Sequence, residues 1–193
     1  MVVKSVNGGN MFKKILILGV AVLIQGCVSN DIVMNNESYI SAGQIKPEMF
    51  SSYIYNKFHQ ELASDGLSVD RNSSSVLLTI QDDLVFEQNS SIIKKDFERK
   101  LNNIASTALL SDLSKVRIIV HSDNQGNYFD NINKTSDKAF AIKDYFVKKG
   151  IKETNITYFG VASKQPLYDN ETEENRRKNR RVEIDIENEL QNN

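Results

Sequence analysis

His121, Ser122 and Asp123 form a short polar run whose residue types could serve acid–base catalysis or ligand binding. A histidine and a carboxylate can move protons, or a carboxylate can hold a cationic ligand through a charged hydrogen bond. The sequence shows neither a Gly-x-Ser-x-Gly motif nor a phosphate-binding glycine loop. The second histidine, His59, lies in another segment, and neither histidine has a Cys or His partner at metal-ligand spacing. We therefore predict a binding site without metal or cofactor, and a protein that is not an enzyme.

The elements that would position Asp123 follow from hydrophobic periodicity. Residues 116–120 read VRIIV, which indicates a buried strand that ends just before His121. Residues 136–149 are predicted to form the next helix, with Gly150 as the residue that ends it. Asp123 and His121 are then expected in the loop that joins this strand to this helix.

The other segments alternate between helical and extended patterns. Phe50, Ile54, Phe58 and Leu62 recur every four residues, which predicts a helix over residues 47–63. A second amphipathic pattern predicts a helix over residues 92–110. Strands are predicted over residues 67–70, 76–80, 155–159 and 181–187. Together these elements predict an α+β fold, an α/β sandwich in which helices cover one face of a small mixed sheet.

Several blocks, in this order, resemble the OmpA-like C-terminal domain. They are VFEQNSSIIKKDFERKLNNIA at 85–105, HSDNQG at 121–126, KKGI at 148–151, YFGVASKQP at 158–166, NET at 170–172 and NRRKNRRVEI at 175–184. The resemblance extends from about residue 76 to residue 186. It implies a βαβαβ fold with helices on one side of the sheet. It also implies non-covalent binding of peptidoglycan, through the diaminopimelate of the stem peptide.

The resemblance assigns binding roles to particular residues. The free end of diaminopimelate carries an ammonium and a carboxylate on one carbon, so a site for it needs an acid and a base a few ångströms apart. Asp123 would accept from the ammonium. Lys138 stands where the family usually has an arginine, and it would face the carboxylate. The other residues that match the family's pocket or shape its loop are Asn89, Asn131, Ser122 and Gly126.

Four of these assignments leave an alternative open. Asp123 could simply cap a turn before Gly126, because Asp and Asn favour such loops. Lys138 offers a point charge where arginine offers a planar fork, so its presence predicts either weaker binding or a fold kept without binding. Ordinary loop chemistry is the alternative for Asn89 and Asn131.

A basic cluster occupies residues 176–181 and has the composition of a nucleic-acid patch. Acidic residues surround it, however, and the chain as a whole carries 24 basic against 25 acidic residues. We therefore predict that nucleic acid is not a partner. The resemblance implies instead that Arg176, together with Arg180 or Arg181, belongs to a helix and strand that close over the binding loop.

The N-terminal segment is predicted to be a targeting signal. Residues 11–27 read MFKKILILGVAVLIQGC, a positive start and a short apolar run that is typical of a secretory signal peptide. The final residues resemble a bacterial lipobox, in which Cys27 would be lipidated; the alternative is a cleaved signal with an unmodified thiol. Cys27 is the only cysteine, so an intrachain disulfide is excluded. Val28 follows the cysteine, whereas an Asp there would resemble the inner-membrane retention signal of enteric bacteria; in a Gram-negative chain its absence points to the outer membrane.

These observations predict an outer-membrane lipoprotein that binds peptidoglycan and faces the periplasm. The alternatives are an outer-membrane component of a secretion, conjugation or motility machine, or a regulatory lipoprotein with other envelope proteins as partners. In a component of such a machine, the helix and hairpin before the resemblance would be a docking surface. The predicted parts are a signal peptide at 1–27, a flexible tether at 28–46, an N-terminal helix and hairpin at 47–75, the OmpA-like domain at 76–187 and a tail at 188–193.

Overall fold

The structure, a computed structural model, describes residues 31–33, 39–41, 47–64 and 66–188. The predicted signal peptide and Cys27 lie outside the described residues, as does nearly all of the predicted tail. Among the described residues, no helix combines the length and the apolar character that crossing a membrane requires.

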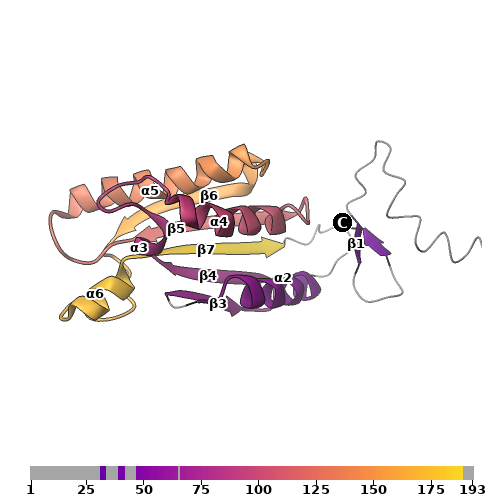
Figure 1. Ribbon diagram of the computed structural model, residues 1–193, viewed down its shortest axis with the longest axis horizontal. Coiled ribbons are helices and arrows are strands. Elements are labelled where there is room, and N and C mark those ends of the chain that lie inside the picture. Colours follow the sequence, from indigo (N-terminus) through magenta and orange to yellow (C-terminus); the bar gives the residue numbers. More distant parts are fainter. Residues whose placement is uncertain (1–30, 34–38, 42–46, 65, 189–193) are drawn as a thin grey trace, which may run out of the picture.

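A five-stranded sheet forms the centre of the fold, in the spatial order β3-β4-β7-β5-β6 (Figure 1). The parallel pair β5–β6 sits in a sheet whose other neighbours are antiparallel, so the sheet is mixed. Its strands are β3 (Leu67–Arg71), β4 (Ser75–Gln81), β5 (Ser114–His121), β6 (Ile156–Ala162) and β7 (Arg181–Asn188).

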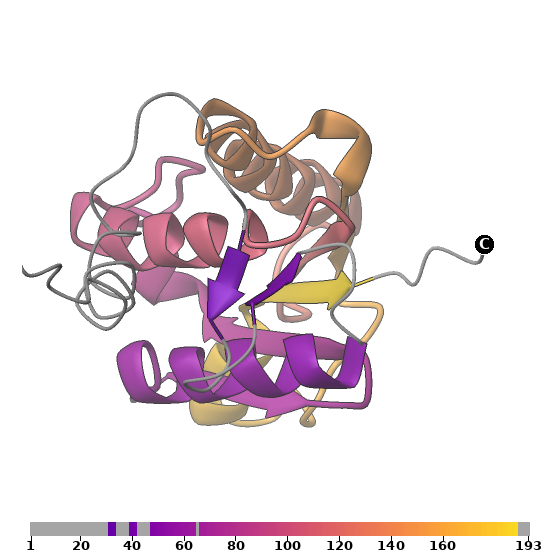
Figure 2. The same cartoon turned by 90° about the vertical axis from the view of Figure 1, so that its right-hand side faces the viewer.

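Three helices cover one face of this sheet, as Figures 1 and 2 show. They are α2 (Pro47–Glu61), α4 (Lys95–Ala108) and α5 (Tyr128–Lys148). Shorter helical segments lie between strands: α3 (Asp82–Val85), η2 (Glu153–Asn155) and α6 (Glu173–Asn179). The predicted fold class, a small mixed sheet with helices on one face, is confirmed.

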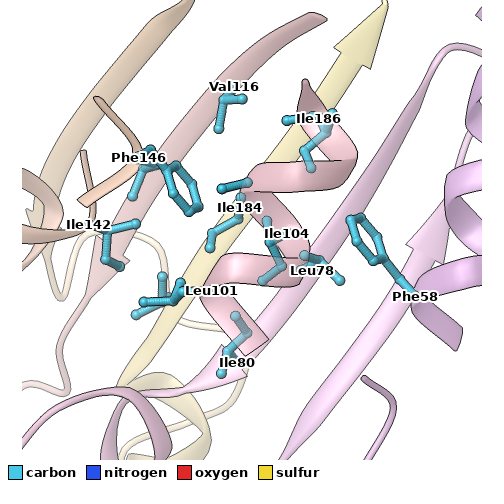
Figure 3. Packing of buried hydrophobic residues seen from close by; sticks show 14 of the residues in the cluster. Phe58, Leu78, Ile80, Leu101, Ile104, Val116, Ile142, Phe146, Ile184 and Ile186 are labelled. Atoms are coloured by element: carbon cyan, nitrogen blue, oxygen red, sulfur yellow. The ribbon is translucent and has the colours of Figure 1, made fainter. Parts of the chain in front are cut away.

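One hydrophobic core joins the three helices to the sheet (Figure 3). Alternate residues of β4, β5 and β7 point into it, as the period of a strand requires. The helices contribute aromatic and branched side chains at helical spacing. The labelled core residues are Phe58 from α2, Leu101 and Ile104 from α4, Ile142 and Phe146 from α5, and Leu78, Ile80, Val116, Ile184 and Ile186 from the strands.

The helix and hairpin at the start of the described globular part share this core. The boundary predicted between residues 75 and 76 falls in the β3–β4 hairpin, whose two strands pair from Leu67 with Ile80 to Arg71 with Val76. The apolar face of α2 is buried against the sheet rather than exposed. That face is therefore occupied within the chain and is not available to a partner protein.

The segment predicted to be a flexible tether contains two short strands. β1 (Asp31–Val33) pairs antiparallel with β2 (Tyr39–Ser41). Both carry residue types that favour strands, Ile and Val in the first and Tyr and Ile in the second. The prediction of a tether did not include them because three-residue strands are too short to show a period.

Helix α5 begins at Tyr128, well before the predicted start at residue 136. Asn127 caps it, because its side-chain oxygen accepts hydrogen bonds from the main-chain N–H groups of Phe129 at 2.8 Å and Asp130 at 3.3 Å. The first turns were missed because their residues are mostly polar and show no apolar period. Asn131 therefore lies on a helix rather than in a loop.

Strand β6 passes very close to α5 at Gly160, two residues before the strand ends. The prediction placed Gly160 at the end of the strand, but hydrogen-bonded pairing with β5 continues to Ala162. A Cβ atom at Gly160 would lie 2.2 Å from the main-chain nitrogen of Ser136 and 2.5 Å from the carbonyl carbon of Thr135. Glycine is required here because any side chain would push the first half of α5 away from the sheet.

Candidate binding site

A cavity of about 860 Å³ lies at the end of the sheet where β4 and β5 finish. Helix α3, the start of α5 and helix α6 all lie near this end, at the left of Figure 1. The structure brings together here most of the residues that the sequence singled out. Those that line the cavity are Asp123, Lys138, Asn89, Asn131, Ser122 and Arg180. The remaining predicted supporting residues, Gly126, Arg176 and Arg181, stand outside its lining.

Asp123 is the acid of the site, and the residue as a whole is only 7% exposed. One carboxylate oxygen accepts from the main-chain N–H of Gln125 at 3.0 Å, which is the turn-capping contact that the sequence left open. The other oxygen accepts from the guanidinium of Arg180 at 2.5 Å. Ser122 supports the loop by donating its hydroxyl to the carbonyl of Asp123 at 2.8 Å. Asp123 therefore shapes the loop and also presents a charge to the cavity.

Lys138 is the base of the site, but it pairs with an acid that the sequence analysis did not identify. Its ammonium donates to both carboxylate oxygens of Asp82, at 2.8 and 2.7 Å. It also lies 5.1 Å from the ring centre of Phe86. That Lys138 faces a ligand carboxylate stays a prediction, and in the structure its ammonium already pairs with Asp82.

A sequence signal for Asp82 did exist. β4 and β5 both pair antiparallel with β7, so they run in the same direction. Their carboxyl ends therefore meet at one edge of the sheet, and an acid lies within two residues of each strand end. Asp82 comes directly after β4, and Asp123 comes two residues after the end of β5. The prediction missed this pairing because strand order could not be read from the sequence.

The two asparagines predicted to line the cavity have structural roles in its walls. Asn131 donates its side-chain amide to the carbonyl of Gln125 at 2.7 Å, which ties α5 to the loop that follows β5. Asn89 has a left-handed backbone, with φ of 55°, a conformation that asparagine tolerates better than most residues. Gly126 also has a positive φ, 82°. Each therefore has a local structural role in the loop or wall that surrounds the cavity.

Arg180 links the cavity to α6. It binds Asp123 on one side and donates to Glu173 at 2.6 Å on the other. Partial burial opposes its charge, but these two hydrogen bonds outweigh burial and raise the pKa of Arg180 above its ordinary value. The same contact with Arg180, followed by one with Arg176, lowers the pKa of Glu173. The result is a chain of alternating charges that runs from the cavity to α6.

The basic cluster of residues 176–181 is neutralised by nearby acids. Every lysine and arginine in it has a carboxylate partner within 3.0 Å. The positive charge that resembled a nucleic-acid patch is therefore balanced by neighbouring negative charge. The pairs are Arg176 with Glu173, Arg177 with Asp83, Lys178 with Glu174, Arg180 with Asp123 and Glu173, and Arg181 with Glu183.

Buried Asn179 fastens the loop that precedes α6. Its side-chain oxygen accepts from the N–H groups of Leu167 and Tyr168, at 2.9 and 3.0 Å. Its amide nitrogen donates to the side-chain oxygen of Asn170 at 3.1 Å. That same oxygen accepts from the N–H of Asn124, at 3.3 Å, in the loop that carries the acid of the site. The loop before α6 thus supports the loop that follows β5.

His121 is the last residue of β5 rather than a loop residue, which corrects the prediction. It is 2% exposed, and its Nε2 atom lies 3.4 Å from a carboxylate oxygen of Glu183 on the neighbouring strand. Burial alone would raise the pKa of Glu183. Contacts with His121 and Arg181 outweigh burial and hold that pKa at about 2, below the ordinary 4.5.

Metal coordination has no basis in the described part of the chain, where no group of three or more His, Cys, Asp and Glu side chains is placed to hold an ion. The cavity instead offers charged hydrogen-bonding groups of both signs. Such a surface can bind a small polar or zwitterionic group without changing it chemically.

Comparison with known proteins gives this arrangement a family. Residues 85–180, from the end of α3 to Arg180, match the OmpA family. The chain carries an OmpA-family domain. The match includes every predicted binding residue from Asn89 to Arg180, with Arg181 just beyond it.

Relatives of this OmpA-family domain occur in envelope proteins. The chain is 23% identical over 130 residues to the probable lipoprotein YiaD of Escherichia coli (strain K12), a match that covers 67% of this chain and 59% of the relative. It is 32% identical over 101 residues to the outer-membrane lipoprotein YfiB of Pseudomonas aeruginosa, covering 52% of this chain and 60% of the relative. The matches thus span about three fifths of either relative.

A solved structure shows the same fold. The cell wall anchor of the T6SS from Pseudomonas aeruginosa superposes with a TM-score of 0.62 at 21% identity. The similarity covers 75% of this chain and all of that one. The mixed sheet and its helices are therefore an arrangement that this OmpA-family domain shares with a known protein.

Proposed function

We propose that this chain binds peptidoglycan non-covalently through the diaminopimelate of the stem peptide. As a lipoprotein of the outer membrane, it would tether that membrane to the cell wall from the periplasmic side. The outer-membrane and lipoprotein names of relatives such as YiaD and YfiB support this setting. The predicted lipidation site, Cys27, supports it from the sequence.

The observation that carries the proposal is the nearly buried carboxylate of Asp123 at the cavity wall. Its two oxygens are held by the Gln125 main chain and by Arg180, so the acid is fixed in place before any ligand arrives. A fixed carboxylate is a suitable acceptor for an ammonium group because little ordering is left for binding to impose. The cavity volume of about 860 Å³ is within the range of small-ligand sites and exceeds what one amino-acid side chain needs.

The chemistry of the cavity favours binding over turnover. Asp123 and Lys138 each have an internal partner of opposite charge and are held in place by charged hydrogen bonds. The site is therefore suited to hold a charged group, as a wall anchor must.

Co-sedimentation with purified sacculi tests the proposal. The full chain, solubilised in mild detergent, should pellet with sacculi. Asp123→Asn should stay in the supernatant, because the amide removes the charge but can still accept from the Gln125 N–H. Asp70→Asn is the matched control, since Asp70 is exposed on β3 and outside the cavity lining, and it should pellet like the unmodified chain. Equal pelleting of Asp123→Asn and the control would sink the site assignment.

A further inference from the structure

Asp82 and Lys138 form a closed ion pair inside the cavity. Each side chain is 16% exposed, so solvent screens the pair only weakly. Asp82 is itself fixed, because its main-chain N–H donates to the carbonyl of Arg180 at 3.0 Å. The ring of Phe86 lies against the ammonium of Lys138. Lys138 is thus held in one place and its charge is already neutralised.

The rest of the lining carries no surplus of positive charge. Arg180 is shared between two carboxylates, those of Asp123 and Glu173. Lys94 donates to the main-chain carbonyl of Asp83, while Lys134 is exposed at the rim, where water and salt screen it. Five acids face four lysines and arginines across the lining: Asp82, Asp83, Glu87, Asp123 and Asp137 against Lys94, Lys134, Lys138 and Arg180.

A ligand carboxylate placed against Lys138 would therefore lie beside the carboxylate of Asp82. Two adjacent carboxylates repel each other, and this repulsion offsets the attraction of the ligand carboxylate to Lys138. An uncharged carboxamide avoids this conflict. Its oxygen can accept the third proton of the Lys138 ammonium, and its N–H groups can donate to Asp82, which has unused lone pairs.

We propose that Asp82 sets the ligand preference of the cavity: it favours a stem peptide whose diaminopimelate carries a carboxamide beside the ammonium over one with a free carboxylate there. The inference rests on the proposed function, since it concerns the same cavity and the same ligand. Asp123 keeps its role as acceptor for the ammonium. Asp82 and Lys138 together bind the neutral amide: Asp82 accepts from its N–H group and Lys138 donates to its oxygen.

Calorimetric titration of the full chain with two soluble stem peptides tests the preference. The peptides differ only in that one diaminopimelate group, a carboxylate in the first and a carboxamide in the second. The carboxamide peptide should bind at least about tenfold more tightly. This comparison requires no substitution, so it does not depend on any variant folding.

Two variants then assign the preference to Asp82. Asp82→Asn keeps the shape of the side chain but frees the charge of Lys138, and it should raise the affinity for the carboxylate peptide about tenfold or more. Asp144→Asn is the matched control, because it breaks an Asp–Lys pair of 2.6 Å with Lys148 outside the cavity. The control should leave the preference unchanged.

The outcomes separate this inference from the function on which it rests. Equal or tighter binding of the carboxylate peptide by the unmodified chain overturns the preference and leaves peptidoglycan binding standing. An unchanged preference in Asp82→Asn also overturns it. Binding of neither peptide, together with failure to pellet with sacculi, overturns the proposed function and this inference with it.

Discussion

Arg180 and Asp123 are joined by a hydrogen bond of 2.5 Å between side chains that are 57 residues apart in the sequence. Asp123 follows β5, whereas Arg180 is the residue between α6 and β7. The pair closes one side of the cavity and fixes the acid in a single position. Its formation depends on β7 lying next to β5 in the sheet.

Removal of Arg180 should destabilise the fold. In Arg180→Met the carboxylate of Asp123 keeps its low exposure but loses its charged partner, and we expect the free energy of unfolding to fall by about 2 kcal/mol. Arg177→Met is the control, because the pair of Arg177 with Asp83 has both side chains about half exposed. That change should cost under about 0.5 kcal/mol. Urea denaturation measures both, and equal losses would contradict a special role for Arg180.

Gly160→Ala should disturb the packing of α5 on β6. The added Cβ would overlap the main chain of Ser136, and main-chain atoms cannot move aside as a flexible side chain could. We expect a loss of about 2 to 3 kcal/mol in the free energy of unfolding, the usual range for overpacking.

Gly126→Ala provides the comparison for Gly160→Ala in thermal and urea denaturation. No atom lies within 4 Å of a Cβ built at Gly126, so only its positive φ opposes alanine. The expected loss there is about 1 kcal/mol. A larger loss at Gly126 than at Gly160 would show that backbone conformation, not space, limits this region.

Glu183 should make stability depend on acid pH. Its pKa in the folded protein is about 2, below the ordinary value of 4.5 that applies when the chain is unfolded. The unfolded state therefore binds the proton first, so this contribution is fully present above pH 4.5 and is lost as pH falls from 4.5 towards 2. The groups that face Glu183 and produce the shift are His121 and Arg181.

The variant Glu183→Gln should flatten the change of unfolding free energy between about pH 4.5 and pH 2. Glu174→Gln is the control, because Glu174 pairs with Lys178 on the exposed surface, where solvent screens the interaction. Urea denaturation at several pH values measures the slope for each variant. A slope in Glu183→Gln as steep as in the unmodified chain would assign the pH dependence to other carboxylates.

Prediction from sequence was most successful where a period in the sequence matched a period in the structure. Strand β7 alternates Val182, Ile184 and Ile186 inward, and helix α2 repeats its apolar residues every four positions, so both were predicted close to their observed bounds. The start of α5 was missed because a single polar residue, Asn127, determines it. Capping is a local hydrogen bond, and it leaves no trace in hydrophobic periodicity.

The residues of the cavity also differ in how far the sequence predicted them. Asp123 was recognisable because it lies in the loop just after an apolar strand, in a block that resembles a known family. Its partner Arg180 was predicted only as a supporting residue, and Asp82 was not predicted at all. Both contacts cross between strands, and the sequence does not state which strands are neighbours.

The sequence alone determined the class of the fold, and it predicted Asp123 and Lys138 as the acid and the base of the site. Those features are local, since they depend on residue type and on spacing within one segment. Only the tertiary structure decided what each charge contacts. β4 and β5 end at the same edge of the sheet, so Asp82 and Lys138 meet there. Arg180 directly precedes β7 and contacts Asp123, which follows the neighbouring strand β5. Electrostatic energy depends on distance in space, and that distance exists only once the sheet has formed.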